Sequence, residues 1–263
     1  MIVAGIDIGS ITTEALLFDR EKGLVGYSIL LTGADPGGTS ASALDKALQE
    51  AGRGRPDVVH TVATGCGRRR AAFAEEAVTE ITCLAKGVNY LFPGARTVID
   101  IGGQDTKAIR IDATGRVVEF EMNDKCAAGT GRFLEVMASA LKIDLDRMGE
   151  LSLAHGRHLT ISSICTVFAE SEVISLVSEG EGLPDILHGI STAIADRTMG
   201  LVHRLGGIAG EVVMAGGVAK NSGVVRALEE AMGVVLNIPD EPQVVGALGA
   251  ALLALRKASC RDG

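Results

Sequence analysis

Two cysteines with similar surroundings have the type and spacing that suggest chemistry. Cys126 in "NDKCAAGTGRFLEVM" and Cys165 in "SSICTVFAESEVISL" each stand just before, or at, the first turn of a predicted helix. A helix start favours a thiolate over a thiol, because the dipole and the free N–H groups stabilise negative charge. A single cysteine is most often a small buried core residue. Similar placement twice, 39 residues apart, indicates a shared role.

Three chemistries could use such a pair, and the residues alone leave them open. A catalytic thiol needs a base, and the nearest histidines in sequence are only His155 and His158. A zinc site needs two more ligands, and the chain has no C-x-x-C. Two thiolates are half of a Cys₄ iron–sulfur site. A two-fold dimer would supply the other half, because an isologous contact presents the same residues twice.

A duplicated segment carries the second set of chemical residues. "IDIGSITTEALLFDREKGLVGYSIL" (6–30) and "IDIGGQDTKAIRIDATGRVVEFEMN" (99–123) align without a gap at an offset of 93. Each predicts a buried strand ending in Asp-x-Gly, a polar turn and two further strands, with period-2 alternation clear in the second copy. Eight identities in 25 positions favour duplication.

Strands and helices alternate along the rest of the chain, which predicts an α/β fold. We expect helices within residues 39–52, 68–92, 130–143, 165–180, 183–207 and 242–258. The expected organisation is lobe I at 1–95, completed by the C-terminal helix at 242–263, and lobe II at 96–241. Two related lobes predict a ligand cleft between them.

The duplicated turns are suited to a polyphosphate. Asp7 and Asp100 would face one another across the cleft, and their glycine turns expose N–H groups that can hold phosphate. Two carboxylates beside a polyphosphate need a cation, for which Mg²⁺ with retained waters is the usual choice. Gln104 and Asp105 could orient an attacking water. The turn "MAGGVAKNSGV" (214–224) would admit a flat nucleoside, and the P-loop and G-x-G-x-x-G motifs are absent from the sequence.

The signatures "GIDIGSITTE", "VIDIGGQDTK" and "VVMAGGVAKN" resemble those of the actin-like ATPase superfamily of acetate and sugar kinases, heat-shock chaperones and actin. The resemblance implies a duplicated, ribonuclease H-like fold of two lobes around a nucleotide. Carried over by position, the expected nucleotide-binding residues are Asp7, Gly9, Ser10, Ile11, Thr12, Thr13, Asp100, Gly102, Gly103, Gln104, Gly216, Gly217, Asn221 and Gln243. Glu14 stands where many members have a lysine, its repeat mate is Lys107, and its role is open.

The two cysteine segments resemble the activator ATPases of 2-hydroxyacyl-CoA dehydratases, a family shared with ATP-binding subunits of benzoyl-CoA reductases. The resemblance covers essentially the whole chain. It implies ATP or ADP, Mg²⁺ held through waters by Asp7 and Asp100, and Gln104, Asp105 and Asp7 as catalytic residues. It also implies a homodimer with one 4Fe–4S cluster bridged by Cys126 and Cys165 of each subunit. The implied partners are an iron–sulfur dehydratase or reductase component and a ferredoxin or flavodoxin donor.

Three other functions are alternatives to that of an electron-transferring activator. They are a subunit of a stable benzoyl-CoA reductase complex, a small-molecule kinase that uses Asp105, and an ATP-regulated scaffold. The kinase would leave the cysteine segments unexplained. Sequence does not distinguish the acyl-CoA system or the electron donor.

The composition of the chain excludes several classes of protein and of partner. An apolar fraction of 47% in 263 residues excludes a disordered chain. The net charge of −8 argues against nucleic acid as a partner. We expect no leader, because the chain begins with a strand-like run and without a basic n-region. We expect no membrane span, because no apolar run reaches about 20 residues. Five widely spaced cysteines indicate a reducing, cytoplasmic setting, with Cys66, Cys83 and Cys260 outside the cluster.

Overall fold

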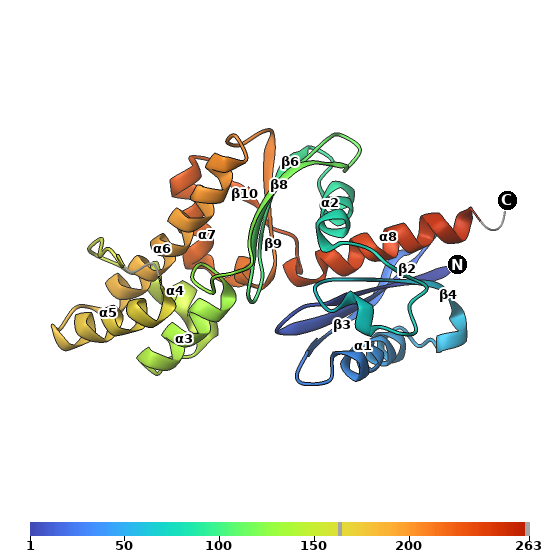
Figure 1. Ribbon diagram of the computed structural model, residues 1–263, viewed down its shortest axis with the longest axis horizontal. Coiled ribbons are helices and arrows are strands. Elements are labelled where there is room, and N and C mark those ends of the chain that lie inside the picture. Colours follow the sequence, from blue (N-terminus) through green and yellow to red (C-terminus); the bar gives the residue numbers. More distant parts are fainter. Residues whose placement is uncertain (163–164, 261–263) are drawn as a thin grey trace. The chain divides into compact units, whose positions relative to one another are not determined.

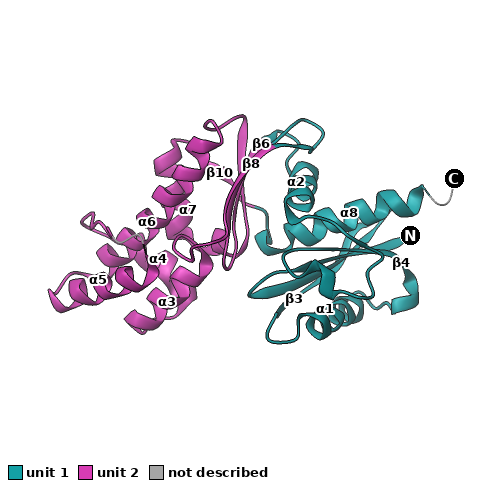
Figure 2. Ribbon diagram, viewed as in Figure 1, with its two compact units in different colours: residues 1–95, 111–118, 239–263 teal, residues 96–110, 119–238 magenta. Residues whose placement is uncertain are grey.

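The computed structural model describes residues 1–162 and 165–260, and its chain divides into two compact units (Figures 1 and 2). Unit 1 contains Met1–Ala95, Ile111–Val118 and the chain from Pro239 on, and unit 2 contains Arg96–Arg110 and Glu119–Ile238. Each unit is built around a five-stranded sheet. The lobe bounds and the cleft expected from the sequence stay predictions.

The two sheets have the same strand order. The first runs β3-β2-β1-β4-β5 and the second β8-β7-β6-β9-β10. The strands of the first sheet are β1 (Ile2–Ile8), β2 (Thr12–Asp19), β3 (Gly23–Leu31), β4 (Val58–Thr64) and β5 (Glu76–Ala77). Those of the second are β6 (Ala95–Ile101), β7 (Thr106–Ile111), β8 (Val117–Asn123), β9 (Glu211–Ala215) and β10 (Leu236–Asn237). β1 and β6 are equal in length and offset by 93 residues, so the duplication in sequence is a duplication of structure.

Three helices cover the sheet of unit 1. They are α1 (Pro36–Glu50), α2 (Glu80–Leu91) and α8 (Val245–Ser259). Alternate residues of β1 face opposite sides, so Ile6 packs with Leu44 of α1 and Val3 packs with Leu248 of α8. α2 and α8 also pack against one another. Their contact is close, since a Cβ on Gly249 would overlap the carbonyl of Cys83.

The helix expected over residues 68–92 is wrong in its first half. The chain forms a short turn and then β5 before α2 begins at Glu80. The reason is the open edge of β4, whose backbone groups need partners. The N–H of Glu75 donates to the Thr61 carbonyl (3.1 Å), and that of Val78 donates to the Ala63 carbonyl (2.9 Å). Sheet pairing overrides the local helical pattern there.

Unit 2 carries more helices, and Figure 2 shows α3 to α6 grouped at one end of it. Its helices are α3 (Gly131–Leu141), α4 (Met148–Ser152), α5 (Thr166–Ser178), α6 (Leu183–Arg204) and α7 (Ser222–Met232). Their core is continuous with the sheet, as Phe133 and Met137 of α3 pack in one cluster with Ile99 of β6. The helices expected over 130–143, 165–180 and 183–207 are confirmed with slightly shorter bounds, whereas α4 was not anticipated.

Short 3₁₀ turns complete the secondary structure. They are η1 (Arg55–Asp57), η2 (Arg68–Arg70), η3 (Leu145–Arg147), η4 (Gly217–Lys220) and η5 (Pro242–Val244). Among the described helices, none combines the length and the apolar character that a membrane span requires.

Candidate functional site

The two Asp-x-Gly turns have the same internal geometry. In unit 1 the N–H of Gly9 donates to the carbonyl of Thr12 at 2.9 Å. In unit 2 the N–H of Gly102, 93 residues later, donates to the carbonyl of Asp105 at the same distance. Ser10 and Gln104 are exposed within these two turns. Each unit therefore presents one closed, glycine-containing turn at the end of its central strand.

The half-buried carboxylate of Asp7 is held between two glycines. A Cβ on Gly65 or on Gly246 would overlap that carboxylate, so both positions must lack a side chain. Gly65 has φ +85°, which favours glycine for a second reason. Sequence reasoning did not include either glycine in the site. Gly65 directly follows β4, whereas Gly246 lies in α8, far from Asp7 in sequence.

Gly216 is the counterpart of Gly65 in unit 2. It follows β9 as Gly65 follows β4, and it has φ +83°. A Cβ on Gly216 would overlap the Ile101 carbonyl and would lie 2.9 Å from Oδ1 of Asp100. Gly216 of the predicted adenosine turn therefore lies directly against the predicted second phosphate turn, which is the Asp-x-Gly turn at residues 100–105. Gly217, the next residue, is exposed at the start of η4.

Lys107 neutralises the second phosphate turn from within. Its Nζ donates to Oδ2 of Asp100 at 3.0 Å and to Oδ1 of Asp105 at 2.6 Å. The Lys107 side chain is only 3% exposed. In the ladder, Lys107 stands opposite Asp100, while the equivalent position opposite Asp7 is occupied by buried Glu14. One turn therefore contains an acid–base pair where the other contains two acids.

Other expected nucleotide residues have structural partners. Thr32 donates to the Gly9 carbonyl (2.9 Å), so the fully buried Thr13 donates to the Thr32 hydroxyl (2.9 Å). Thr13 thereby braces the first turn from inside, while Ile11 and Thr12 are half-buried. Asn221 is the N-cap of α7, and its Oδ1 accepts from the Val224 N–H at 3.1 Å.

The remaining nucleotide residues lie on separate segments. Half-buried Gln243 is in η5 of unit 1, where its N–H donates to Glu241 at 3.1 Å. Gly103, half-buried beside Gly102, lies in the second turn of unit 2.

The two cysteines precede neighbouring helices of unit 2. Cys165 is exposed and is the N-cap of α5, with its carbonyl accepting the Ala169 N–H at 2.9 Å. Cys126 is half-buried and lies five residues before α3, whose N-cap is Thr130. The expectation of a cysteine at the helix start is therefore accurate for Cys165 and inaccurate for Cys126. α3 and α5 pack against one another.

Hydrogen bonds join the segment after Cys126 to the second phosphate turn. The Thr106 hydroxyl donates to the Gly129 carbonyl at 2.8 Å. The N–H groups of Gly131 and Arg132 donate to the carbonyls of Gly102 and Gly103, each at 2.9 Å. A displacement of the turn must therefore move the start of α3, or break these bonds.

The other cysteines have surroundings that fit no shared ligand set. Cys83 is fully buried, and that burial raises its pKa to about 12. Cys66 is exposed near the first turn and donates to the Ile8 carbonyl at 3.5 Å, and Cys260 is exposed at the end of α8.

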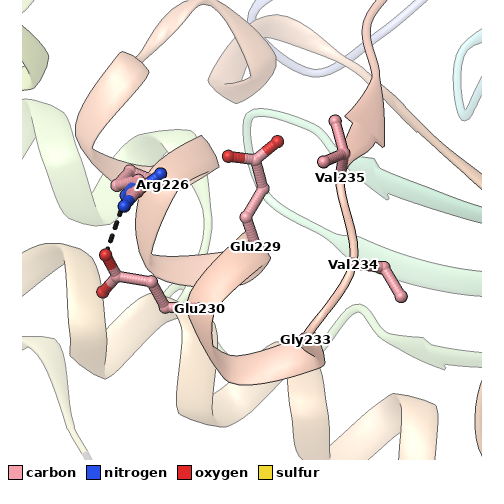
Figure 3. Close-up of a pocket in the computed structure, with 6 residues that line it drawn as sticks. All are labelled: Arg226, Glu229, Glu230, Gly233, Val234 and Val235. Carbon is pink, nitrogen blue, oxygen red and sulfur yellow. Dashed lines mark hydrogen bonds and ion pairs between the residues drawn. The ribbon is translucent and has the colours of Figure 1, made fainter.

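A surface pocket of about 260 Å³ lies at the C-terminal end of α7 (Figure 3). It is lined by Arg226, Glu229, Glu230, Gly233, Val234 and Val235. Arg226 Nε and Glu230 Oε1 form an ion pair of 2.8 Å within it. None of the expected nucleotide residues lines this pocket, so it has no assigned part in the site.

Two sheets of identical strand order, each with a closed Asp-x-Gly turn after its central strand, define a duplicated actin-like ATPase fold, as the sequence predicted. More narrowly, the chain belongs to the BadF/BadG/BcrA/BcrD ATPase family, whose sequence model matches residues 4–254. The family resemblance seen in the cysteine segments is confirmed.

Named relatives extend over nearly the whole chain. The activator of lactoyl-CoA dehydratase from Anaerotignum propionicum is 48% identical over 258 residues, covering 98% of this chain and 99% of its own. One of the benzoyl-CoA reductase subunits from Thauera aromatica is 38% identical over 261 residues, covering 95% and 92%. The solved activator of 2-hydroxyisocaproyl-CoA dehydratase from Clostridium difficile, with bound ADPNP, has a TM-score of 0.95 at 43% identity, covering 100% and 97%.

Proposed function

We propose that this protein is an ATP-hydrolysing activator that delivers an electron to a 2-hydroxyacyl-CoA dehydratase. The observation that carries the proposal is the set of hydrogen bonds between the second phosphate turn and the segment that follows Cys126. An activator must couple nucleotide chemistry to a redox centre, and this contact is a direct route for that coupling. The relatives named as dehydratase activators support the same function.

ATP and Mg²⁺ would use the two turns. Asp7 and Asp100 would hold Mg²⁺ through waters, and the N–H groups of the turns would bind phosphate oxygens. Lys107 lowers the negative charge around Asp100, so that turn can approach a phosphate with less repulsion. Gln104, which is exposed, would orient the attacking water, and Asp105 would hold the hydrogen-bond network of that water.

Cys126 and Cys165 fit one half of a 4Fe–4S site. Two thiols of one unit precede packed helices, and Cys165 is exposed to a second molecule. The first two turns and the middle of α5 also expose apolar side chains, with Val167 66%, Phe168 68% and Ile174 49% exposed. A second copy of the chain, related by a two-fold axis, would cover this face and supply two further thiolates. When bound, the cluster would accept an electron from a ferredoxin or flavodoxin and pass it to the partner enzyme.

Membership of a benzoyl-CoA reductase complex is the second candidate function. The 38% identity to one component of that enzyme supports it. It differs in assembly, because a reductase component belongs to a stable hetero-oligomer. Purification of this chain alone separates the two: an activator is expected as a brown homodimer after anaerobic cluster reconstitution, and a chain that assembles only with other, different chains would favour the reductase.

Replacing Gln104 with alanine is expected to slow ATP hydrolysis by about 10- to 100-fold, because the attacking water loses its orienting group. ATP affinity should change far less, since the turn backbone is kept. Steady-state hydrolysis and equilibrium nucleotide binding measure the two effects. Gln49→Ala, at an exposed position of α1, is the matched control. An unchanged hydrolysis rate in the Gln104 variant would remove this residue from the catalytic group.

Replacing Thr106 with valine is expected to weaken the coupling between nucleotide and cluster. The buried hydroxyl that donates to the Gly129 carbonyl is lost while the side-chain shape is kept. The rate at which a chelator removes iron should then differ less between the ATP-bound and ADP-bound protein. Thr97→Val is the matched control, because Thr97 is equally buried and its hydroxyl donates to the Ala209 carbonyl at 2.8 Å. An undiminished nucleotide effect in the Thr106 variant would contradict this route of coupling.

A further inference from the structure

Three histidines of unit 2 converge at a place that neither the phosphate turns nor the cysteines use. His155 and His158 lie between α4 and α5, and His188 lies in the second turn of α6. A ring nitrogen of each lies within 4.8 Å of one on each of the others. Imidazole nitrogens that converge in this way form a ligand set for a transition-metal ion.

The backbone holds the histidine segment in position. Asp185 lies one turn before His188 on α6, and its Oδ1 accepts from the N–H groups of Gly156 (2.7 Å) and Arg157 (2.9 Å). The N–H groups of Arg157 and Gly156 lower the pKa of Asp185, so this carboxylate stays charged. The segment between His155 and His158 is therefore held next to His188 by the bonds that the Gly156 and Arg157 N–H groups donate to Asp185, before any ligand is bound.

His155 presents a free lone pair. Its Nδ1 lies 3.0 Å from the Ser152 carbonyl oxygen, which can only accept, so Nδ1 carries the proton. In the neutral ring, Nε2 then carries the lone pair. A histidine whose one nitrogen donates to a backbone carbonyl while the other is available is the usual arrangement at a metal site.

His158 and His188 share a proton. Nδ1 of His158 lies 2.8 Å from Nε2 of His188, so one of these nitrogens donates and the other accepts. A cation can take the place of that proton, which then moves to the outer nitrogen of the same ring. Asp185 and Glu230 add negative charge near His188.

We propose that His155, His158 and His188 bind one divalent transition-metal ion, with Zn²⁺ as the ion that three imidazoles and one water suit best. Tetrahedral Zn–N bonds of about 2.0–2.1 Å place the nitrogens about 3.3 Å apart. Binding therefore separates the facing nitrogens of His158 and His188, which lie 2.8 Å apart without the ion, and ends the parallel stacking of His155 on His188. The ion would tie His158, seven residues before Cys165, to α6.

Zinc titration of the full-length chain tests the site. Cys126→Ser and Cys165→Ser are introduced first, because cysteine thiolates are themselves zinc ligands and would compete with the histidines. The chain is stripped with a chelator and titrated with Zn²⁺ against a chromophoric chelator. We expect one Zn²⁺ per chain. Adding His155→Asn should weaken binding by more than the roughly 10- to 100-fold typical of losing an outer-shell partner.

His203→Asn is the matched control, because His203 is an exposed histidine on the same helix, α6, and should leave zinc affinity unchanged. His158→Asn is a second variant at an exposed ring, so a folding defect at half-buried His155 does not decide the result. Circular dichroism verifies that each variant is folded. Zinc affinity equal to the parent in both His155→Asn and His158→Asn overturns the proposal, as does a parent chain that binds no zinc.

Discussion

Replacing either Cys126 or Cys165 with serine is expected to remove the iron of the reconstituted protein completely. Each substitution takes two of four thiolates from a cluster shared across a two-fold axis, and a cluster does not persist on the remaining two. ATP binding should stay measurable, because neither cysteine belongs to a phosphate turn. Iron and sulfide analysis after anaerobic reconstitution, together with nucleotide binding, measures the result.

Cys66→Ser is the matched control for this experiment. Cys66 is also exposed, but it lies in unit 1, where its thiol donates to the Ile8 carbonyl. Its iron content should equal that of the parent protein. Full iron in either the Cys126 or the Cys165 variant would rule out the shared-cluster arrangement, even if the protein remained an ATPase.

Replacing Lys107 with methionine is expected to lower the free energy of unfolding by about 3–5 kcal/mol, the usual cost of removing one partner from a buried ion pair. The ammonium lies 3.0 Å from Asp100 and 2.6 Å from Asp105, and the Asp100 side chain is 9% exposed. Without Lys107, the two carboxylates remain close together and lose the ammonium that pairs with both. Denaturant unfolding of the chain without nucleotide measures the loss.

Lys125→Met is the control for the lysine experiment, because the Lys125 side chain is 88% exposed and its pairing with Asp124 is at the surface. A change within about 0.5 kcal/mol is expected there. Added Mg²⁺ should restore part of the stability of the Lys107 variant by neutralising the two carboxylates. A stability equal to that of the parent would show that Lys107 does not hold the turn together.

Sequence predicts the sheets well where a local pattern and the final packing agree. The offset of 93 residues located β1 and β6, because both strands are buried on two faces and end in the same turn. The prediction of a helix failed over residues 68–78, where a segment with a helix-like sequence pattern pairs with the free edge of β4 as a strand. Apolar spacing cannot reveal such pairing, since it depends on an edge built from a distant part of the chain.

In the candidate site, too, some residues follow from the sequence and others only from the packing. The acids Asp7 and Asp100 follow from the motif, but the glycines that make room for them do not. Gly246 is 239 residues from Asp7 in sequence, and only the packing of α8 on β1 brings it there. The place of Cys126, five residues before α3, likewise depends on an irregular segment whose hydrogen bonds reach the second turn. Periodicity contains no information about such a segment.

The position of α8 also determines when the first turn can be completed during synthesis. β1 leaves the ribosome early, whereas Gly246 is made more than 200 residues later. At about 5–20 residues per second, the interval is roughly 10–50 s. During this interval the first sheet lacks α8, and the Asp7 carboxylate lacks Gly246, one of the two glycines that enclose it. The surroundings of Asp7 are therefore completed only after every residue of unit 2 has been translated.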